Sequence, residues 1–94
     1  MVIVIAEHFL DDAGRQEFTA WIQSVKVLLQ SYEGYVSLQQ LKDLQSEDRL
    51  MLELRFTNVE LLHNWNGSED HRQAMGRLSP YRTKKQVSHI YQYV

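Results

Sequence analysis

Residues 56–81 (FTNVELLHNWNGSEDHRQAMGRLSPY) contain the side chains best suited to chemistry in this sequence. His71 recurs at helical spacing with Ala74 and Met75, so an ionisable ring lies in an otherwise apolar stripe. A histidine titrates near neutral pH and can accept a proton from a substrate. Trp65 precedes it and offers an apolar wall or an indole N–H donor. This pattern predicts a small apolar site with His71 and Trp65 as its catalytic candidates.

Each of these residues also has a purely structural explanation. His71 could be an early helix residue, partly buried and bonded to the backbone. Trp65 could pack in the core beside Leu61 and Leu62. His63 falls on the polar side of the same helical pattern, and we expect it to be inert.

Several further residues could bind a ligand at this site. They are Tyr81, Arg82, Lys85, Met75 and Phe9. The first three could stabilise negative charge that develops on a substrate oxygen. A basic cluster of this kind is also common on a solvated surface.

The elements that must position these residues follow from hydrophobic periodicity. Period-two or apolar runs predict strands over 2–10, 35–44, 49–56 and the C-terminal VSHIYQYV. A helical pattern runs from the Asp11–Gly14 turn to about Tyr32, and two short helices fill most of 57–79. The order strand, helix, strand, strand, split helix, strand is that of a ferredoxin-like split βαβ. The prediction is therefore one α+β domain over residues 1–94, with a four-stranded antiparallel sheet.

The boundaries of the two short helices carry local signals. Thr57 with Glu60 fits a capping box at the start of the first helix. Gly67 is expected to end that helix in the left-handed conformation. Ser68 is expected to cap the second helix, and Pro80 to end it.

The first strand predicts an assembly. Its run VIVIA is apolar at every position, which favours a strand covered on both faces. The helices of a split βαβ cover only one face of the sheet. We expect a second copy to cover the other, so that two sheets pack into a dimeric α/β barrel with help from the C-terminal strand. His8 is expected at the end of this strand, half exposed, with a pocket-lining donor as the alternative.

Composition narrows the classes of function. The formal net charge is −2, which argues against a nucleic-acid or membrane-surface partner. The absence of cysteine excludes disulfides and thiolate chemistry and suits a cytoplasmic protein. The N-terminal run has no basic leader, so no signal peptide is expected. No histidine pair has the spacing of a zinc motif, and no metal site is expected.

The chain resembles the antibiotic biosynthesis monooxygenase family of dimeric α/β-barrel proteins. The resemblance rests on the first strand MVIVIAEHF, the block LLHNW-NGSEDHRQAM, the exit Ser79–Tyr81 and the aromatic last strand. It covers nearly the whole chain and is carried most specifically by the tryptophan before the Ser-Glu helix start.

The resemblance implies an oxygenase chemistry that needs no cofactor. Members oxidise quinol-like or polyketide-like aromatics, and others degrade haem. The haem-degrading members carry an axial histidine where this sequence has Met75, and an asparagine where it offers Glu7 and His8. The polyketide-oxidising members carry an asparagine where this sequence has Leu61. A haem role is therefore the less favoured implication.

The sequence thus leads to two classes of function. The first is a cofactor-independent monooxygenase that oxidises a small aromatic quinol- or polyketide-like substrate with O2. The second is a non-catalytic binding or stress-response module that holds a small apolar ligand in the same site.

Overall fold

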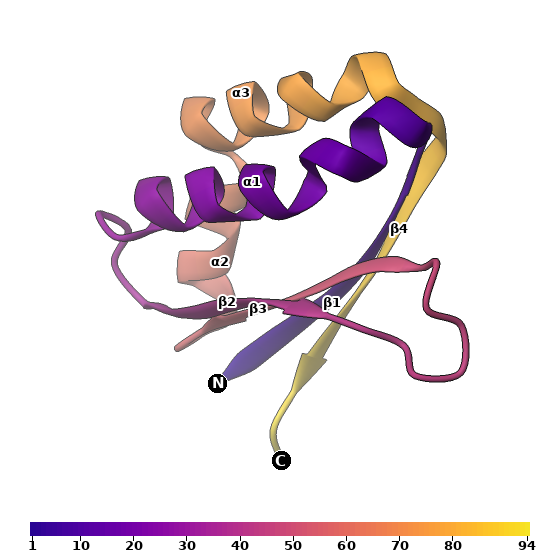
Figure 1. Ribbon diagram of the computed structural model, residues 1–94. Coiled ribbons are helices and arrows are strands. Elements are labelled where there is room, and N and C mark those ends of the chain that lie inside the picture. Colours follow the sequence, from indigo (N-terminus) through magenta and orange to yellow (C-terminus); the bar gives the residue numbers. More distant parts are fainter.

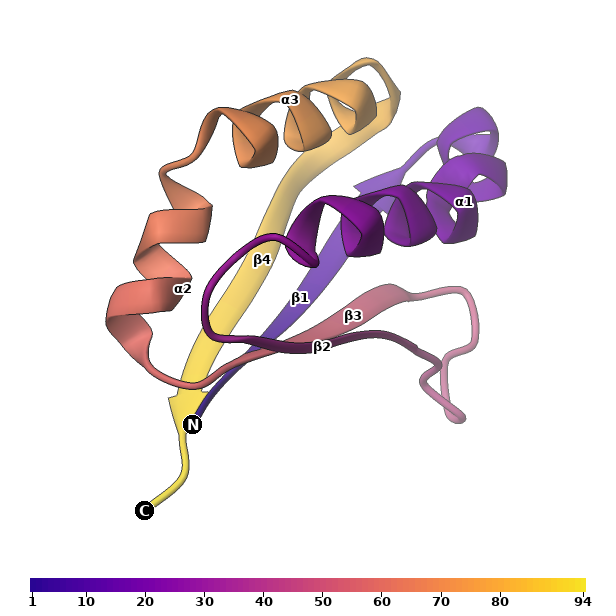
Figure 2. The ribbon, with the colours of Figure 1, turned by 90° about the vertical axis from the view of Figure 1, so that its left-hand side faces the viewer.

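The computed structural model describes all residues, 1–94, and arranges them in two layers (Figure 1). The strands are β1 (Val2–Leu10), β2 (Tyr35–Leu41), β3 (Leu50–Phe56) and β4 (Arg82–Gln92). The helices are α1 (Asp12–Leu29), α2 (Val59–Asn66) and α3 (Glu69–Leu78), followed by the 3-10 turn η1 (Ser79–Tyr81). All strand pairs are antiparallel in the order β2-β3-β1-β4, and the helices lie on one face of the sheet (Figure 2). The predicted ferredoxin-like α+β fold is confirmed.

The central strand β1 divides its side chains between the two faces of the sheet. Val2, Ala6, His8 and Leu10 point to the helix-covered face, where each is buried. The alternate residues point to the open face, which no helix covers. His8 is only 3% exposed, so the expectation that it lies half exposed was wrong. The reason is that β1 runs on to Leu10 beneath α1, which covers the strand to its end.

Helix α1 supplies five of the sixteen buried hydrophobic residues of the core, more than any other single element. Phe18, Ile22 and Leu29 are at most 1% exposed, and burial of such side chains stabilises the fold by roughly 1.5–3 kcal/mol each. The Asp11 side chain caps this helix by accepting from the Gly14 N–H at 2.9 Å. The helix ends at Leu29 rather than near Tyr32, because the next N–H groups bond three residues back and form a turn.

The caps of the short helices were predicted in part. Ser68 caps α3 and accepts from the His71 N–H at 3.1 Å, as expected. Asn58, not Thr57, caps α2, because the Thr57 N–H still donates to Gly34 O beside the end of β3. Gly67 has φ −91°, so the expected left-handed conformation was wrong there.

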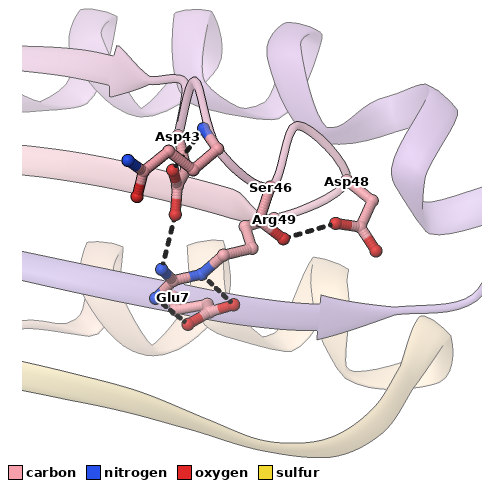
Figure 3. A network of polar contacts seen from close by, with 6 residues as sticks. Glu7, Asp43, Ser46, Asp48 and Arg49 are labelled. Atoms are coloured by element: carbon pink, nitrogen blue, oxygen red, sulfur yellow. Dashed lines mark hydrogen bonds and ion pairs between the residues drawn. The ribbon is translucent and has the colours of Figure 1, made fainter.

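One polar network fixes the turn between β2 and β3 (Figure 3). Arg49 donates to both carboxylate oxygens of Glu7, at 3.0 and 2.6 Å, and to Asp43 at 2.8 Å. The Asp43 side chain also accepts from the Gln45 N–H at 2.9 Å. This local turn bends the chain early, so β2 stops at Leu41 instead of Leu44.

The open face of the sheet combines apolar side chains with an internal ion pair. Ile3, Ile5, Met51, Val87 and Tyr91 lie on it by register, and Val87 and Tyr91 are 45% and 54% exposed. Glu53 and Arg55, which share this face of β3, form an ion pair at 3.0 Å. None of the helices has the length and apolar character needed to cross a bilayer.

Candidate functional site

The covered face of the sheet holds a mostly apolar cavity of about 110 Å³, which we call the central pocket. Its floor is the middle of the sheet, and its roof is formed by α1, α3 and the end of α2. Asn66 and the half-exposed Ile90 line the cavity and mark its mouth, between α2 and the edge strand β4. An engineered cavity of about 150 Å³ holds one benzene, so this pocket accepts a single ring at most without rearrangement.

His71 and Trp65 meet in the wall of the central pocket. The cap at Ser68 begins α3 so that His71 lies in its first turn, facing the end of α2. The two rings pack edge to face, with centroids 5.3 Å apart and an interplanar angle of 86°. No hydrogen bond within the chain engages the imidazole of His71, and burial lowers its pKa below the usual 6.5. The ring is therefore neutral at pH 7 and free to accept a proton.

A second histidine, His8, lies at the inner end of the same pocket. Its ring packs against Phe18 and Trp21, with centroids 5.5 and 5.4 Å away. Burial, and then the nearby positive charge of Arg82, lower the pKa of His8 to about 4. Such an imidazole is neutral and weakly basic, so it suits hydrogen bonding better than proton abstraction.

Trp21 fixes the roof of the pocket. Its indole Nε1 donates to the backbone carbonyl of Ala74 at 2.8 Å, which ties α1 to α3. The bond is buried, and its loss would leave an unsatisfied carbonyl in the core. Trp21, Val25 and Leu29 of α1 all line the pocket.

Of the five predicted ligand-binding residues, only one lines the central pocket. Met75 lines the central pocket with His71 and Trp65. Tyr81 lies on the far side of α1, where it lines a surface groove with Arg77. Phe9 and Lys85 do not line the pocket either.

Phe9 and Lys85 face away from the cavity for a simple geometric reason. Phe9 is on the open face, where Lys84 Nζ lies 4.3 Å from the centre of its ring. Lys85 is exposed on the edge strand β4. Arg82 pairs with the buried Leu10, and two of its guanidinium nitrogens are buried beside His8, just beyond the residues that line the cavity.

Sequence reasoning missed the inner end of the pocket. His8, Trp21 and Gln86 line it, and only His8 had been considered, as an alternative. The signal was present in the alternation of β1, which places His8 on the same face as Val4 and Ala6. No group of three His, Cys, Asp or Glu side chains gathers anywhere in the chain in a way that could hold a metal ion.

Fold and pocket together define a ferredoxin-like α+β protein with a small, mostly apolar pocket on the helix-covered face of its sheet. Residues 1–77 match the family model of antibiotic biosynthesis monooxygenases, and the chain belongs to this family. The resemblance inferred from the sequence is thereby confirmed. No curated protein sequence matches the chain.

Solved structures share this fold along its full length. A conserved protein of Methanosarcina mazei Go1 is 19% identical, with a TM-score of 0.84 over 97% of this chain and 90% of the other. Rv0793 of Mycobacterium tuberculosis is 16% identical, with a TM-score of 0.83 over 99% and 94%. A protein solved as an antibiotic biosynthesis monooxygenase is 10% identical, with a TM-score of 0.81 over 100% and 99%. At these identities the likeness concerns the fold alone.

Proposed function

We propose that this protein is a cofactor-independent monooxygenase that oxidises a small quinol-like aromatic with O2. The observation that carries the proposal is the central pocket, in which a neutral His71 faces Trp65 in an apolar cavity of about 110 Å³. The volume favours a single-ring hydroquinone over naphthoquinols and anthrones, whose further rings must extend past the mouth. Membership of the family and structural neighbours such as a possible oxidoreductase of Bacteroides thetaiotaomicron support the reaction class.

The substrate can supply all the electrons that the reaction needs. A hydroquinone plus O2 gives a hydroxyquinone plus water: one oxygen atom enters the ring and the other leaves as water. His71 takes the phenolic proton, which leaves an electron-rich anion that can transfer an electron to O2. The apolar walls, including Trp65 and Met75, hold the ring and exclude water from the reduced oxygen species.

The test is oxygen consumption by the purified protein, without added metal, flavin or haem, against single-ring hydroquinones, naphthoquinols and anthrones. We expect turnover above autoxidation, greatest for single rings, with label from 18O2 in the product. In His71→Asn the rate should fall by about 10²-fold or more, because the proton acceptor is lost. The exposed His63→Asn is the matched control and should keep the wild-type rate. An equal rate in His71→Asn would remove this residue from the mechanism, and an absence of label in the product would exclude a monooxygenase.

The second candidate is a binding or stress-response module with no turnover. It is favoured by the mostly apolar lining of the pocket, which can hold a small apolar ligand without any reaction. It predicts that single-ring aromatics raise the melting temperature without oxygen uptake. Haem is the weakest candidate, because a cavity of about 110 Å³ is far smaller than a porphyrin.

We also propose that the protein acts as a homodimer in the cytoplasm. The open face carries Ile3, Ile5, Met51 and Tyr91 beside charges that are already paired within the chain, so a second copy can cover it without stranding a carboxylate. Stable interfaces bury about 800 Å² on each partner, which a four-stranded sheet face can supply. The lack of cysteine supports a reducing compartment.

A further inference from the structure

Buried polar atoms without hydrogen-bond partners lie at the inner end of the central pocket and directly behind it. His8 Nδ1, Gln86 Oε1 and two nitrogens of Arg82, Nε and Nη2, are all buried and form no hydrogen bond. Buried polar groups are nearly always paired, and each orphaned group is costly. These atoms account for every buried side-chain atom of this kind in the chain. Their concentration at one end of a cavity points to a binding site.

The strand register brings these three side chains together. His8 on β1 lies between Glu7, which pairs with Val87, and Phe9, which pairs with Lys84. The bulge between these pairs places it opposite Gln86, and both residues line the cavity. Arg82 extends from the same covered face as its partner Leu10, and its charge is close enough to act on His8.

The positive charge of Arg82 is not neutralised within the chain. Arg82 belongs to no ion pair. By contrast, Arg49 and Arg55 each pair with a carboxylate, that of Glu7 and that of Glu53. Glu7, the residue before His8 on β1, points to the open face, and its carboxylate is paired with Arg49 (Figure 3). An anionic oxygen beside His8 would therefore meet an unopposed positive charge in a site shielded from water.

We propose that the inner end of the pocket, formed by His8, Gln86 and Arg82, binds the negatively charged oxygen of a single-ring aromatic anion. The oxygen, a phenolate, enolate or carboxylate, is held near His8 and Arg82, and a hydroxyl next to it donates to Gln86 Oε1. His8 and Arg82 are binding residues here, not proton acceptors. The proposal deepens the oxygenase function, because the site would favour the anion that is left when the phenolic proton is removed, but it concerns binding and does not require turnover.

The test uses ligands that do not react with O2. Benzoate and its neutral isostere benzamide are titrated by calorimetry, and 4-nitrophenol is followed by the yellow absorbance of its ionised form. We expect benzoate to bind at least about tenfold more tightly than benzamide. We also expect the protein to increase the ionised fraction of 4-nitrophenol at constant pH, because the site favours the anion.

The variants separate a specific site from general charge. Arg82→Gln should reduce the ratio of the affinities for benzoate and benzamide to about one, and it should abolish the increase in ionised 4-nitrophenol. Gln86→Leu should weaken the binding only of ligands that carry the adjacent hydroxyl, such as salicylate. Lys85→Gln removes the same charge from an exposed position of β4 and should keep the preference. If Arg82→Gln does not fold, the neutral Arg82→Met removes the same charge, and it should reduce the preference for benzoate in the same way.

Two results would overturn the proposal: equal affinity for benzoate and benzamide in the wild type, or an unchanged preference in a folded Arg82 variant. Failure of the oxygenase function looks different. If the protein prefers anions but consumes no oxygen, the anion-binding site is supported and the oxygenase function is contradicted. If it oxidises neutral hydroquinones but shows no preference for anions, the oxygenase function is supported and the anion-binding site is contradicted.

Discussion

At the scale of single residues, the two histidines of the central pocket differ in what surrounds them. His71 is half-buried in the pocket wall, and its pKa is lowered by burial alone. His8 is enclosed by Phe18, Trp21 and β4, and it also has the positive charge of Arg82 nearby. The first arrangement keeps a proton acceptor available, whereas the second keeps an imidazole uncharged down to about pH 4.

The buried state of His8 predicts a loss of stability in acid. Its pKa is about 4 in the folded chain and near 6.5 when unfolded, so the unfolded state binds more protons between these values. The stability is fully present above pH 6.5 and is lost as the pH falls toward 4. The loss amounts to about 3 kcal/mol, which lowers the melting temperature by roughly 10–20 °C in a domain of this size.

The comparison that isolates this effect is between the wild type and His8→Gln, with unfolding by urea followed from pH 7 to pH 4. The carboxylates titrate in both proteins, so the difference between the two curves belongs to His8. The variant should lose about 3 kcal/mol less than the wild type over this range. Parallel curves would show that His8 is protonated as easily in the folded chain as in the unfolded one.

The residue scale also shows the limit of reading a site from the sequence. His71 and Met75 could be found because they share one face of a helical pattern, and Trp65 because it lies on the apolar side of the helix before it. The inner end could not, because the partners of His8 lie some 74 to 78 positions later in the sequence, on β4. Their proximity depends on the register and the bulge of an antiparallel pair, which no local pattern encodes.

At the scale of elements, the start of α1 packs without spare room against the turn that leads into β4. Gly14 is buried there, and a Cβ at this position would lie 2.5 Å from Tyr81 Cβ and 3.0 Å from Leu10 Cβ. The Asp11 N–H also donates to Tyr81 O at 2.8 Å, which closes the same contact. The helix can approach β1 and η1 this closely only because residue 14 has no side chain.

Substitution of two glycines by alanine tests this contact. Gly14→Ala should lower the free energy of unfolding by about 1–3 kcal/mol, because the methyl group overlaps atoms attached directly to the backbone. Gly76→Ala in α3 is the control, since nothing lies within 4 Å of its new Cβ. That variant should gain about 0.5–1 kcal/mol from improved helix propensity. A Gly14→Ala protein as stable as the wild type would mean that α1 shifts easily relative to η1.

The elements themselves were largely readable from the sequence. Strand and helix periodicity gave every helix and strand in the correct order, because the core is built from amphipathic segments, although β4 begins at Arg82 and not at the predicted Val87. The errors lie at boundaries, where tertiary hydrogen bonds decide. The Thr57 N–H donates to Gly34 O beside the end of β3, and Asn58 caps α2 in its place. The turn around Asp43 ends β2 early.

At the scale of the whole molecule, the two faces of the sheet have very different surroundings. The covered face carries the core and the pocket, while the open face leaves Ile3, Ile5 and Tyr91 with no layer above them. The dimer that we propose would complete the structure by packing one open face on another in a two-fold arrangement.

Sedimentation at micromolar concentration tests this assembly. The wild type should sediment as a dimer, and Ile5→Lys should sediment as a monomer, because it replaces an apolar side chain with a charged one at the centre of the proposed interface. Val27→Lys introduces the same charge on α1, where Val27 is 72% exposed, and should leave the dimer intact. A monomeric wild type would leave the open face without the partner that we assign to it.

The chain has two tryptophans, Trp21 and Trp65, and both line the central pocket. All of its indole fluorescence therefore originates at the walls of the site. A ligand that enters between them changes the emission of the whole protein, and a quinone formed there quenches it by accepting an excited electron. The protein thus carries its own optical probe, in which entry, turnover and release can be timed in a stopped-flow instrument without any label.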